Sequence, residues 1–451
     1  MRERKRIYMT SSNQTVDWYV SHFKAFERTL NGESKSALHQ LRREAMEKLS
    51  DSGLPTTRHE EWKYTNIAPI TKTEFTPVFK YDAAGLTREK IARYSFGTHH
   101  QLVFVNGHFS ADLSTAGSLP KGVVCGSLAA SIRNGEKHVR QYLGTQIKID
   151  ETPFVSLNTA FLNDGAFLYV PDGILLEESI HILFVASSHT PVLVTPRNLI
   201  ILGNHAQASV VESYVSTEDA QYLTNAVTEI VLGDSAVLEH DKLQNESMTA
   251  FHVAMIYCRL GGGTALTSNS ISIGGSIVRN NVTTVFDAEG SEVTLNGLSL
   301  GTGSQLVDNH TTIDHSKPNC ASHELYKSIL DGTSRGVFNG KIFVRPQAQK
   351  TDAKQTNKTL LLSDGATIDT KPQLEIFADD VKCTHGATVG QLDEEQVFYL
   401  RSRGIDETAA RDILTFAFAG DVVGRVHVDP LKARLENLIR ERLDQGRKQK
   451  A

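Results

Sequence analysis

The sequence predicts a mainly β protein whose core is a solenoid between two helical regions. From residue 166 onward, short runs of Val, Ile, Leu and Thr alternate with Gly, Asn, Asp and Ser, and helix-length apolar stripes disappear. Similar turns begin at Gly203, Gly233, Gly261 and Gly290, at spacings of 30, 28 and 29 residues. Such spacing is typical of stacked coils that cover one another, whereas a sandwich gives no reason for it. We therefore favour a solenoid.

Composition limits the class of protein. The 451 residues contain 47 Lys and Arg against 52 Asp and Glu, a net charge of -5, so nucleic acid is not an expected partner. No stretch approaches the roughly 18 apolar residues that span a bilayer. The basic residues 1–9 are not followed by an apolar run, so no export signal is expected. Four cysteines are too sparse for a disulfide scaffold, and we predict a cytoplasmic protein.

Residues 1–165 are expected to form a mainly helical domain with a connector. The first helix should end at Asn31-Gly32, and its apolar face is Trp18, Tyr19, Phe23, Phe26 and Leu30. The second should follow an N-cap at Ser34 and end at Gly53. Residues 58–66 form the connector. A strand is expected over 102–105 before a turn at 106–107, and an apolar helical stretch over 128–143.

The β-solenoid core is expected over 166–391 and a C-terminal helical domain over 392–451. Asp393 should cap a helix that ends at Gly404, and Asp406 one that ends at Gly420. A third, amphipathic helix should open at Asp429-Pro430. Two interpretations stay open, a cap that closes the end of the solenoid and a surface that docks a partner.

Several familiar enzyme motifs are missing from the sequence. The Gly-rich segment 297–303 lacks the lysine of a nucleotide-binding P-loop and fails the dinucleotide pattern at its third glycine. H-E-x-x-H does not occur. ATP hydrolysis or dinucleotide chemistry by these routes is not expected.

Cys383 and His385 form the most interesting pair of residues. In a strand over 381–385, the side-chain period of two places the thiol and the imidazole on the same face, with Thr384 opposite. Both groups bind iron or zinc, but two ligands do not complete a four-coordinate site, so the others must come from elsewhere. On the residues alone we favour a structural interpretation, with a buried small thiol and a hydrogen-bonded turn histidine.

A second polar cluster spans residues 308–320. His310, His315 and the nearby His323 are candidate ligands or bases. They are equally compatible with a polar face of the solenoid on which neighbouring hydroxyls and amides satisfy each histidine, and we favour that interpretation.

Three stretches together resemble one family. They are Arg58-His-Glu-Glu-Trp-Lys-Tyr-Thr65, then Ser334-Arg-Gly-Val-Phe-Asn-Gly-Lys-Ile342 with Gln355-Thr-Asn-Lys-Thr-Leu-Leu-Leu362, and Cys383-Thr-His-Gly-Ala-Thr-Val-Gly390 continuing through Phe398-Tyr-Leu-Arg-Ser-Arg-Gly404. The sequence resembles the SufB/SufD family of iron-sulfur cluster assembly proteins, and its SufD branch in particular.

The resemblance implies a right-handed parallel β-helix flanked by helical domains, and a non-catalytic scaffold that pairs with SufB and the ATPase SufC. It implies a cluster-assembly contact at His385 and Cys383, which would share metal ligands with SufB. It places SufC docking on the C-terminal domain, at Phe398, Tyr399, Leu400, Arg401, Arg403, Phe416 and Phe418. No cofactor is expected to be tightly bound to the isolated chain, an iron-sulfur cluster is transient in the complex, and a role for flavin is left open, as is a homodimer.

Three alternatives remain at this point. A SufB-like scaffold is disfavoured because many SufB proteins carry an N-terminal cysteine cluster, and here the first cysteine is Cys125. A polysaccharide-active β-helix enzyme fits poorly with the lack of an expected export signal and of disulfides. A purely structural solenoid without a metal role would tolerate removal of His385.

Overall fold

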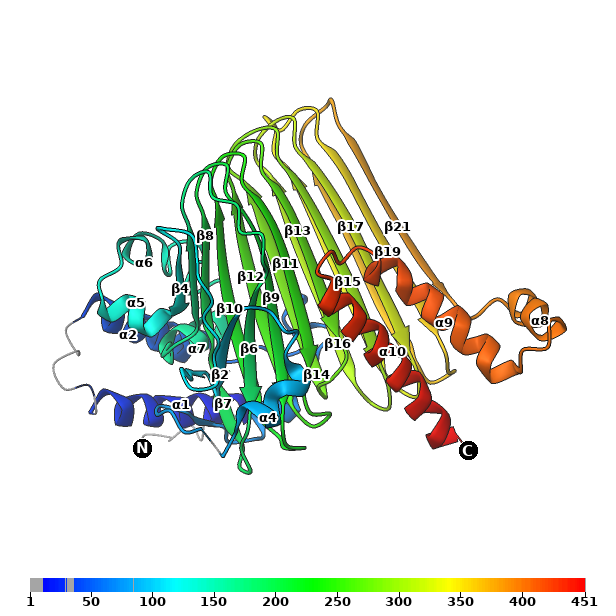
Figure 1. The fold of residues 1–451 in the computed structure, drawn as a ribbon, viewed down its shortest axis with the longest axis horizontal. Coiled ribbons are helices and arrows are strands. Elements are labelled where there is room, and N and C mark those ends of the chain that lie inside the picture. Colours follow the sequence, from blue (N-terminus) through cyan, green and yellow to red (C-terminus); the bar gives the residue numbers. More distant parts are fainter. Residues whose placement is uncertain (1–10, 29, 31–35, 84, 451) are drawn as a thin grey trace, which may run out of the picture.

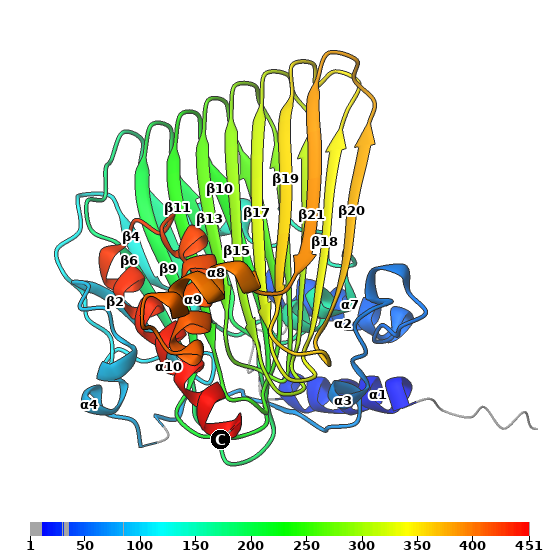
Figure 2. The same cartoon turned by 90° about the vertical axis from the view of Figure 1, so that its right-hand side faces the viewer.

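The computed structural model, which describes residues 11–28, 30, 36–83 and 85–450, is built around two long sheets stacked face to face (Figures 1 and 2). Within these residues, one sheet has 11 strands and the other has 10, and successive strands of the core alternate between the two. Neighbouring strands of the core are parallel, since each coil adds one strand to each sheet. The predicted solenoid is therefore confirmed.

We call the 11-stranded sheet the first sheet and the 10-stranded sheet the second sheet. The first sheet has the order β20 (Thr367–Ile376), β18 (Arg335–Val344), β16 (Leu306–His315), β14 (Ile277–Phe286), β12 (Phe251–Leu260), β10 (Leu223–Leu232), β8 (Arg197–Leu202), β5 (Ala166–Val170) and β4 (Val124–Ser127), with β7 (Val192–Val194) beside β10 and β1 (Thr76–Pro77) beside β7. The second sheet has the order β21 (Lys382–Gly390), β19 (Asp352–Leu361), β17 (Ala321–Leu330), β15 (Glu292–Gly301), β13 (Ala265–Ser272), β11 (Val237–Asn245), β9 (Gln207–Ser216), β6 (Ile180–Ala186), β2 (His100–Val105) and β3 (His108–Phe109).

The core lies between the sheets, in rows of side chains that run along the solenoid axis. Because neighbouring strands are in register and side chains alternate between faces, every second residue of a strand stacks on its equivalents in the coils before and after. One such row is Leu202, Leu232, Leu260 and Phe286, all buried. Each of these side chains contributes about 1.5–3 kcal/mol by leaving water.

The recurring turns carry the chain from the first sheet to the second. The N–H groups of Gly233 and Gly261 each donate to a carbonyl of the previous coil, those of Leu202 and Leu232. A Cβ at Gly233 would lie 2.8 Å from the backbone nitrogen of Asn204 in the turn below, so only glycine lets the turns stack closely. Three of the predicted turn glycines, Gly203, Gly233 and Gly261, are thus explained by the contact between coils, whereas the fourth turn begins at Asp287 and not at Gly290.

The N-terminal helices cover the outer face of the first sheet. These helices are α1 (Ser11–Glu27), α2 (Ala37–Ser52) and α7 (Pro153–Ala160), and they bury an apolar cluster against Leu223, Phe251 and Ile277. The predicted cap at Ser34 and the stop at residues 31–32 lie outside the described residues. The cap of α2 in the structure is Ser36, whose hydroxyl accepts the N–H of His39. The predicted end at Gly53 is confirmed.

The region between these helices and residue 166 is mixed. The strand expected over 102–105 is β2, and Asn106 and Gly107 form the predicted turn to β3. The helical stretch expected over 128–143 is divided at Gly135 into α5 (Leu128–Arg133) and α6 (Lys137–Tyr142). Short helical segments complete the region: η2 (Glu60–Trp62), α3 (Ala68–Thr71), α4 (Arg88–Ile91) and η3 (Ala92–Tyr94). Residues before 166 thus supply β2, β3 and β4 to the solenoid sheets.

The C-terminal helices α8 (Glu394–Ser402), α9 (Glu407–Val423) and α10 (Asp429–Lys450) follow the last strand. Asp393 and Asp406 cap α8 and α9 as predicted, but the predicted end at Gly420 is wrong. Helix α9 continues to a C-cap at Gly424, because Val422 and Val423 bury against the solenoid. Helices α9 and α10 cover the outer face of the second sheet (Figure 1) and leave β20 and β21 as edge strands, so the interpretation as an end cap is wrong.

None of the helices in the described ranges is long and apolar enough to cross a membrane.

Candidate functional site

Strand β21 places Cys383 and His385 at the end of the solenoid. The strand expected over 381–385 begins at Lys382 and continues to Gly390. Cys383 pairs with Ala353 of β19, and His385 pairs with Gln355. Ala353 and Gln355 are buried between the sheets. Their partners Cys383 and His385 therefore also face inward, and Thr384 faces outward. The structure therefore places the thiol and the imidazole on the same, inward face of β21.

The two groups differ in their surroundings. Cys383 is half-buried against an apolar cluster that includes Ile342, Val344 and Ala353. Burial raises the pKa of its thiol, and the Asp352 carboxylate raises it further, so a metal must displace the thiol proton at neutral pH. His385 is exposed and makes no hydrogen bond or ion pair with any residue in the described part of the chain.

The donor set at this end is incomplete. Within the described residues, no group of three or more His, Cys, Asp or Glu side chains is placed to hold a metal ion. One thiol and one imidazole leave a four-coordinate iron or zinc ion two ligands short. A metal or cluster at this position therefore needs ligands from a second molecule.

The end that carries these donors is open to pairing. Strands β20 and β21 are the last strands of the two sheets, and Figure 2 shows them side by side at the end of the stack. Each leaves one row of backbone N–H and C=O groups without a neighbouring strand. Phe377 is 56% exposed, and Ile376 and Val389 are also exposed. Free strand edges beside exposed apolar side chains suit the addition of strands from another protein.

The candidate docking residues of the C-terminal domain do not form one surface. Phe398 and Tyr399 of α8 are 71% and 57% exposed, and Ile413 of α9 is exposed with them. Arg401 is paired with Glu407, and the Arg403 guanidinium lies 5.0 Å from the ring centroid of Tyr399.

The remaining members of that set pack within the chain. Leu400 is half-buried, and Phe416 and Phe418 pack with the cluster between α9, α10 and the second sheet. The Lys327 ammonium lies 4.2 Å from the ring centroid of Phe418. The exposed apolar surface is therefore centred on α8.

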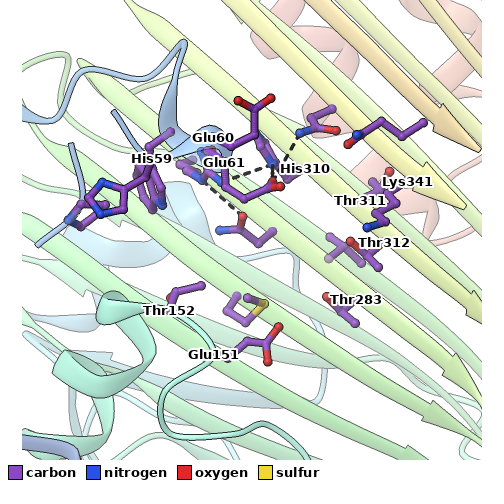
Figure 3. A pocket seen from close by; sticks show the side chains of 18 of the residues that line it. His59, Glu60, Glu61, Glu151, Thr152, Thr283, His310, Thr311, Thr312 and Lys341 are labelled. Carbon is purple, nitrogen blue, oxygen red and sulfur yellow. Dashed lines mark hydrogen bonds and ion pairs between the residues drawn. The ribbon is translucent and has the colours of Figure 1, made fainter. Parts of the chain in front are cut away.

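The connector 58–66 lies on the outer face of the first sheet and borders a cavity of about 760 Å³ (Figure 3). His59, Glu60 and Glu61 line one side of this cavity, Glu151 and Thr152 the other, and Thr283 and Thr312 lie on the strands between them. Sequence reasoning did not find this cavity, because its walls come from segments far apart in the chain.

A buried ion cluster attaches the connector to the solenoid. His310 Nε2 lies 3.0 Å from Asp308 Oδ1, and His310 Nδ1 lies 3.4 Å from Glu61 Oε2. Arg279 Nη1 donates to Asp308 Oδ2 at 2.7 Å, and its guanidinium lies 3.9 Å from the ring centroid of Trp62. Burial opposes protonation of His310, but Asp308 and Glu61 outweigh it and raise its pKa. The cluster thus holds an imidazole and a guanidinium beside carboxylates that favour the protonated form of the imidazole.

The three candidate histidines near residue 310 are separated by the fold. His310 faces the cavity, His315 lies inside the solenoid with Nε2 2.9 Å from Ser322 Oγ, and His323 lies on the second sheet, 3.9 Å from Glu292. The structure does not bring them together as one site, and each has a polar neighbour.

These features define a class of protein: a parallel β-solenoid whose open last coil presents a thiol and an imidazole on one face. Residues 13–182 match the model of the SufBD protein N-terminal region, and residues 184–418 match the SufBD core domain of the SUF system for FeS cluster assembly. The chain belongs to the SufBD family of iron-sulfur cluster assembly proteins, as its resemblance predicted.

Relatives extend over nearly the whole chain. It is 34% identical over 420 residues to an iron-sulfur cluster assembly SufBD family protein of Synechocystis, covering 91% of this chain and 92% of that protein. It is 32% identical over 453 residues to the iron-sulfur cluster assembly protein SufD of Escherichia coli, covering 97% and 98%. The protein named SufD in Bacillus subtilis is 27% identical, covering 90% and 94%.

Proposed function

We propose that this chain is a non-catalytic, SufD-type scaffold that assembles nascent iron-sulfur clusters at its contact with a homologous SufB subunit, driven by the ATPase SufC. The observation that carries the proposal is the placement of Cys383 and His385 on the inward face of an uncovered last coil. The two side chains supply half of a four-coordinate site, and a sister solenoid joined end to end would supply the rest.

The open strand edges give this contact its geometry. A SufB solenoid that pairs its own edge strands with β20 and β21 would continue both sheets and cover Phe377 and Val389. In the isolated chain the end is already exposed. The role of the ATPase is therefore to open and close the contact between the subunits rather than to uncover buried residues.

SufC docking is assigned to α8. Its exposed Phe398 and Tyr399 form an apolar surface that the packing of the chain does not use. Aromatic side chains of this kind are frequent anchors of protein interfaces. Phe416 and Phe418 support the surface from within by fixing α9 on the solenoid.

Co-expression with SufB and SufC, followed by iron and sulfide analysis of the purified assembly, tests the cluster site. His385→Ala should leave the assembly intact while its iron and sulfide content falls, because the variant removes one ligand and no packing contact. Thr384→Ala is the matched control, since it changes the outward face of the same strand. Normal cluster content in His385→Ala would refute the assigned role.

Docking of the ATPase is tested with a double variant, Phe398→Ser with Tyr399→Ser. Removing residues 392–451 would also uncover the apolar face of the second sheet, because Leu431 and Leu435 of α10 pack there. The point variants avoid this. They should abolish co-purification of SufC and leave SufB bound, with Gln396→Ser of the same helix as control. Retention of SufC by the double variant would exclude α8 as the docking surface.

A further inference from the structure

A row of polar side chains leads from the interior of the solenoid to His385. Glu324 of β17 pairs with Gln355 of β19, and Gln355 pairs with His385 of β21. All three occupy inward positions, and adjacent strands lie about 4.8 Å apart. Gln355 is therefore the inward neighbour of His385 in the coil below.

The side-chain amide of Gln355 has one hydrogen-bonded atom and one atom without a hydrogen-bond partner in the described residues. Its Nε2 donates to Glu324 Oε2 at 2.6 Å, and the side chain is 2% exposed. Its carbonyl oxygen Oε1 is buried and has no hydrogen-bond partner in the described residues. A buried acceptor without a donor costs about 1–3 kcal/mol, so its persistence calls for a donor from another source.

The opposite strand leaves space for this arrangement. A Cβ at Gly340 of β18 would overlap the Gln355 amide, and it would lie 2.8 Å from Cζ of Phe338. Only glycine at this inward position admits the glutamine side chain in its observed place. Because Nε2 points to Glu324 in the coil below, Oε1 on the other branch of the amide is available to the coil above, where His385 lies.

We propose that Gln355, held by Glu324, is the positioning residue of His385: its Oε1 accepts one ring N–H of the imidazole and leaves the other ring nitrogen to bind iron. This inference rests on the proposed function for its purpose, but both groups of the proposed hydrogen bond belong to this chain. Metal-binding histidines commonly donate their second ring nitrogen to a carbonyl or carboxylate, which fixes tautomer and orientation. His385 has no hydrogen-bond or ion-pair partner within the described chain, and covering of the end by a second solenoid would remove the water that competes for its N–H.

The test is the tautomer of His385, read from ¹⁵N chemical shifts of histidine-labelled full-length chain, alone and in the co-expressed assembly. Gln355→Leu should change the balance between the two neutral tautomers, and the change should be larger in the assembly. Asn357→Leu is the matched control: Asn357 is equally buried on the same strand and also has an unpartnered oxygen, but its neighbour in β21 is Ala387. The control should leave the His385 signals unchanged.

A reversed pair tests the hydrogen bond independently of packing. The double variant Glu324→Gln with Gln355→Glu keeps the bond between the two residues and still offers His385 an acceptor, so it should restore the wild-type tautomer balance. Cluster content of the assembly should fall about tenfold in Gln355→Leu and recover in the double variant.

The outcomes separate this inference from the proposed function. Identical His385 shifts in wild type and Gln355→Leu, both alone and in the assembly, would overturn the positioning role. A changed tautomer balance together with normal cluster content in His385→Ala would instead support the positioning and refute the cluster-assembly role of His385.

Discussion

The buried carboxyl of Glu324 should make the stability of the solenoid depend on pH. Burial raises its pKa from the ordinary 4.5 to about 7, against the smaller lowering effects of Gln355 and Thr311. A carboxyl with a raised pKa binds its proton more tightly in the folded state. Its contribution to stability is therefore complete below about pH 4.5 and is lost as the pH rises towards 7.

The size of the effect follows from the two pKa values. One pKa unit corresponds to about 1.4 kcal/mol, so the free energy of unfolding should fall by about 2.5 kcal/mol between pH 5 and pH 8 through Glu324. Asp241, which burial raises from 3.8 to about 7, should contribute a similar decrease. Glu324→Gln removes this titrating group and keeps a side chain that can accept and donate, so between pH 5 and pH 8 its free energy of unfolding should fall by about 2.5 kcal/mol less than that of the wild type.

Urea unfolding followed by circular dichroism at pH 5, 6, 7 and 8 measures this difference. Asp241→Asn is the control, because it should remove a separate decrease of similar size without touching the row that leads to His385. The reasoning about Glu324 is refuted if Glu324→Gln and the wild type lose stability equally from pH 5 to pH 8.

Two further predictions concern the first sheet and the connector. Gly165→Ala would place a Cβ against the backbone of β8 and should lower the free energy of unfolding in urea by about 3 kcal/mol. Gly126→Ala is the control and should be tolerated, because no atom lies within 4 Å of the new Cβ. Equal stabilities of the two variants would contradict the close approach at Gly165. Arg279→Gln leaves the buried carboxylate of Asp308 without its guanidinium partner, so it should destabilise the chain by about 3 kcal/mol and expose residues 58–65 to trypsin. Arg259→Gln, which removes an exposed ion pair, is the control and should do neither. Unchanged digestion of Arg279→Gln would show that the cluster does not hold the connector.

The repeat was readable from the sequence because the coils contact one another through their turns. Gly203, Gly233 and Gly261 begin equivalent turns, as the spacing predicted. Gly290 does not: the fourth turn begins at Asp287, whose N–H donates to Leu260, and Gly290 holds the left-handed position with φ 76°. Its spacing still fits the repeat, because glycine is favoured at both places for different reasons.

Helix ends were predicted less well, because a local signal does not report tertiary packing. Gly420 is a plausible stop by sequence, but α9 passes through it since Ala419, Val422 and Val423 bury their side chains on the second sheet. Burial of this row favours continued helix by more than the roughly 1 kcal/mol that an internal glycine costs. The same packing directs the C-terminal helices to the side of the solenoid rather than to its end.

The candidate site also has one feature that neighbouring residues predict and one that depends on contacts between distant residues. Cys383 and His385 share a face because of a period of two, which three consecutive residues suffice to reveal. Their relation to Gln355 and Glu324 depends on how coils of different length align. Residues 324, 355 and 385 are equivalent only after the register of β17, β19 and β21 is known.

That register also explains how a solenoid can combine stability with a reactive end. Each strand contributes side chains to several inward rows, and the polarity of one row does not fix that of the next. Apolar rows can therefore stabilise the solenoid while one row becomes polar towards its end. In the row that ends at His385, Leu295 of β15 is followed by Glu324, Gln355 and the histidine. Polar groups in the interior are costly unless paired, and here Gln355 Nε2 donates to Glu324 Oε2 at 2.6 Å. Glu324 Oε1 and Gln355 Oε1 both lack a hydrogen-bond partner within the described residues, and Gln355 lies in the last buried coil, directly below His385.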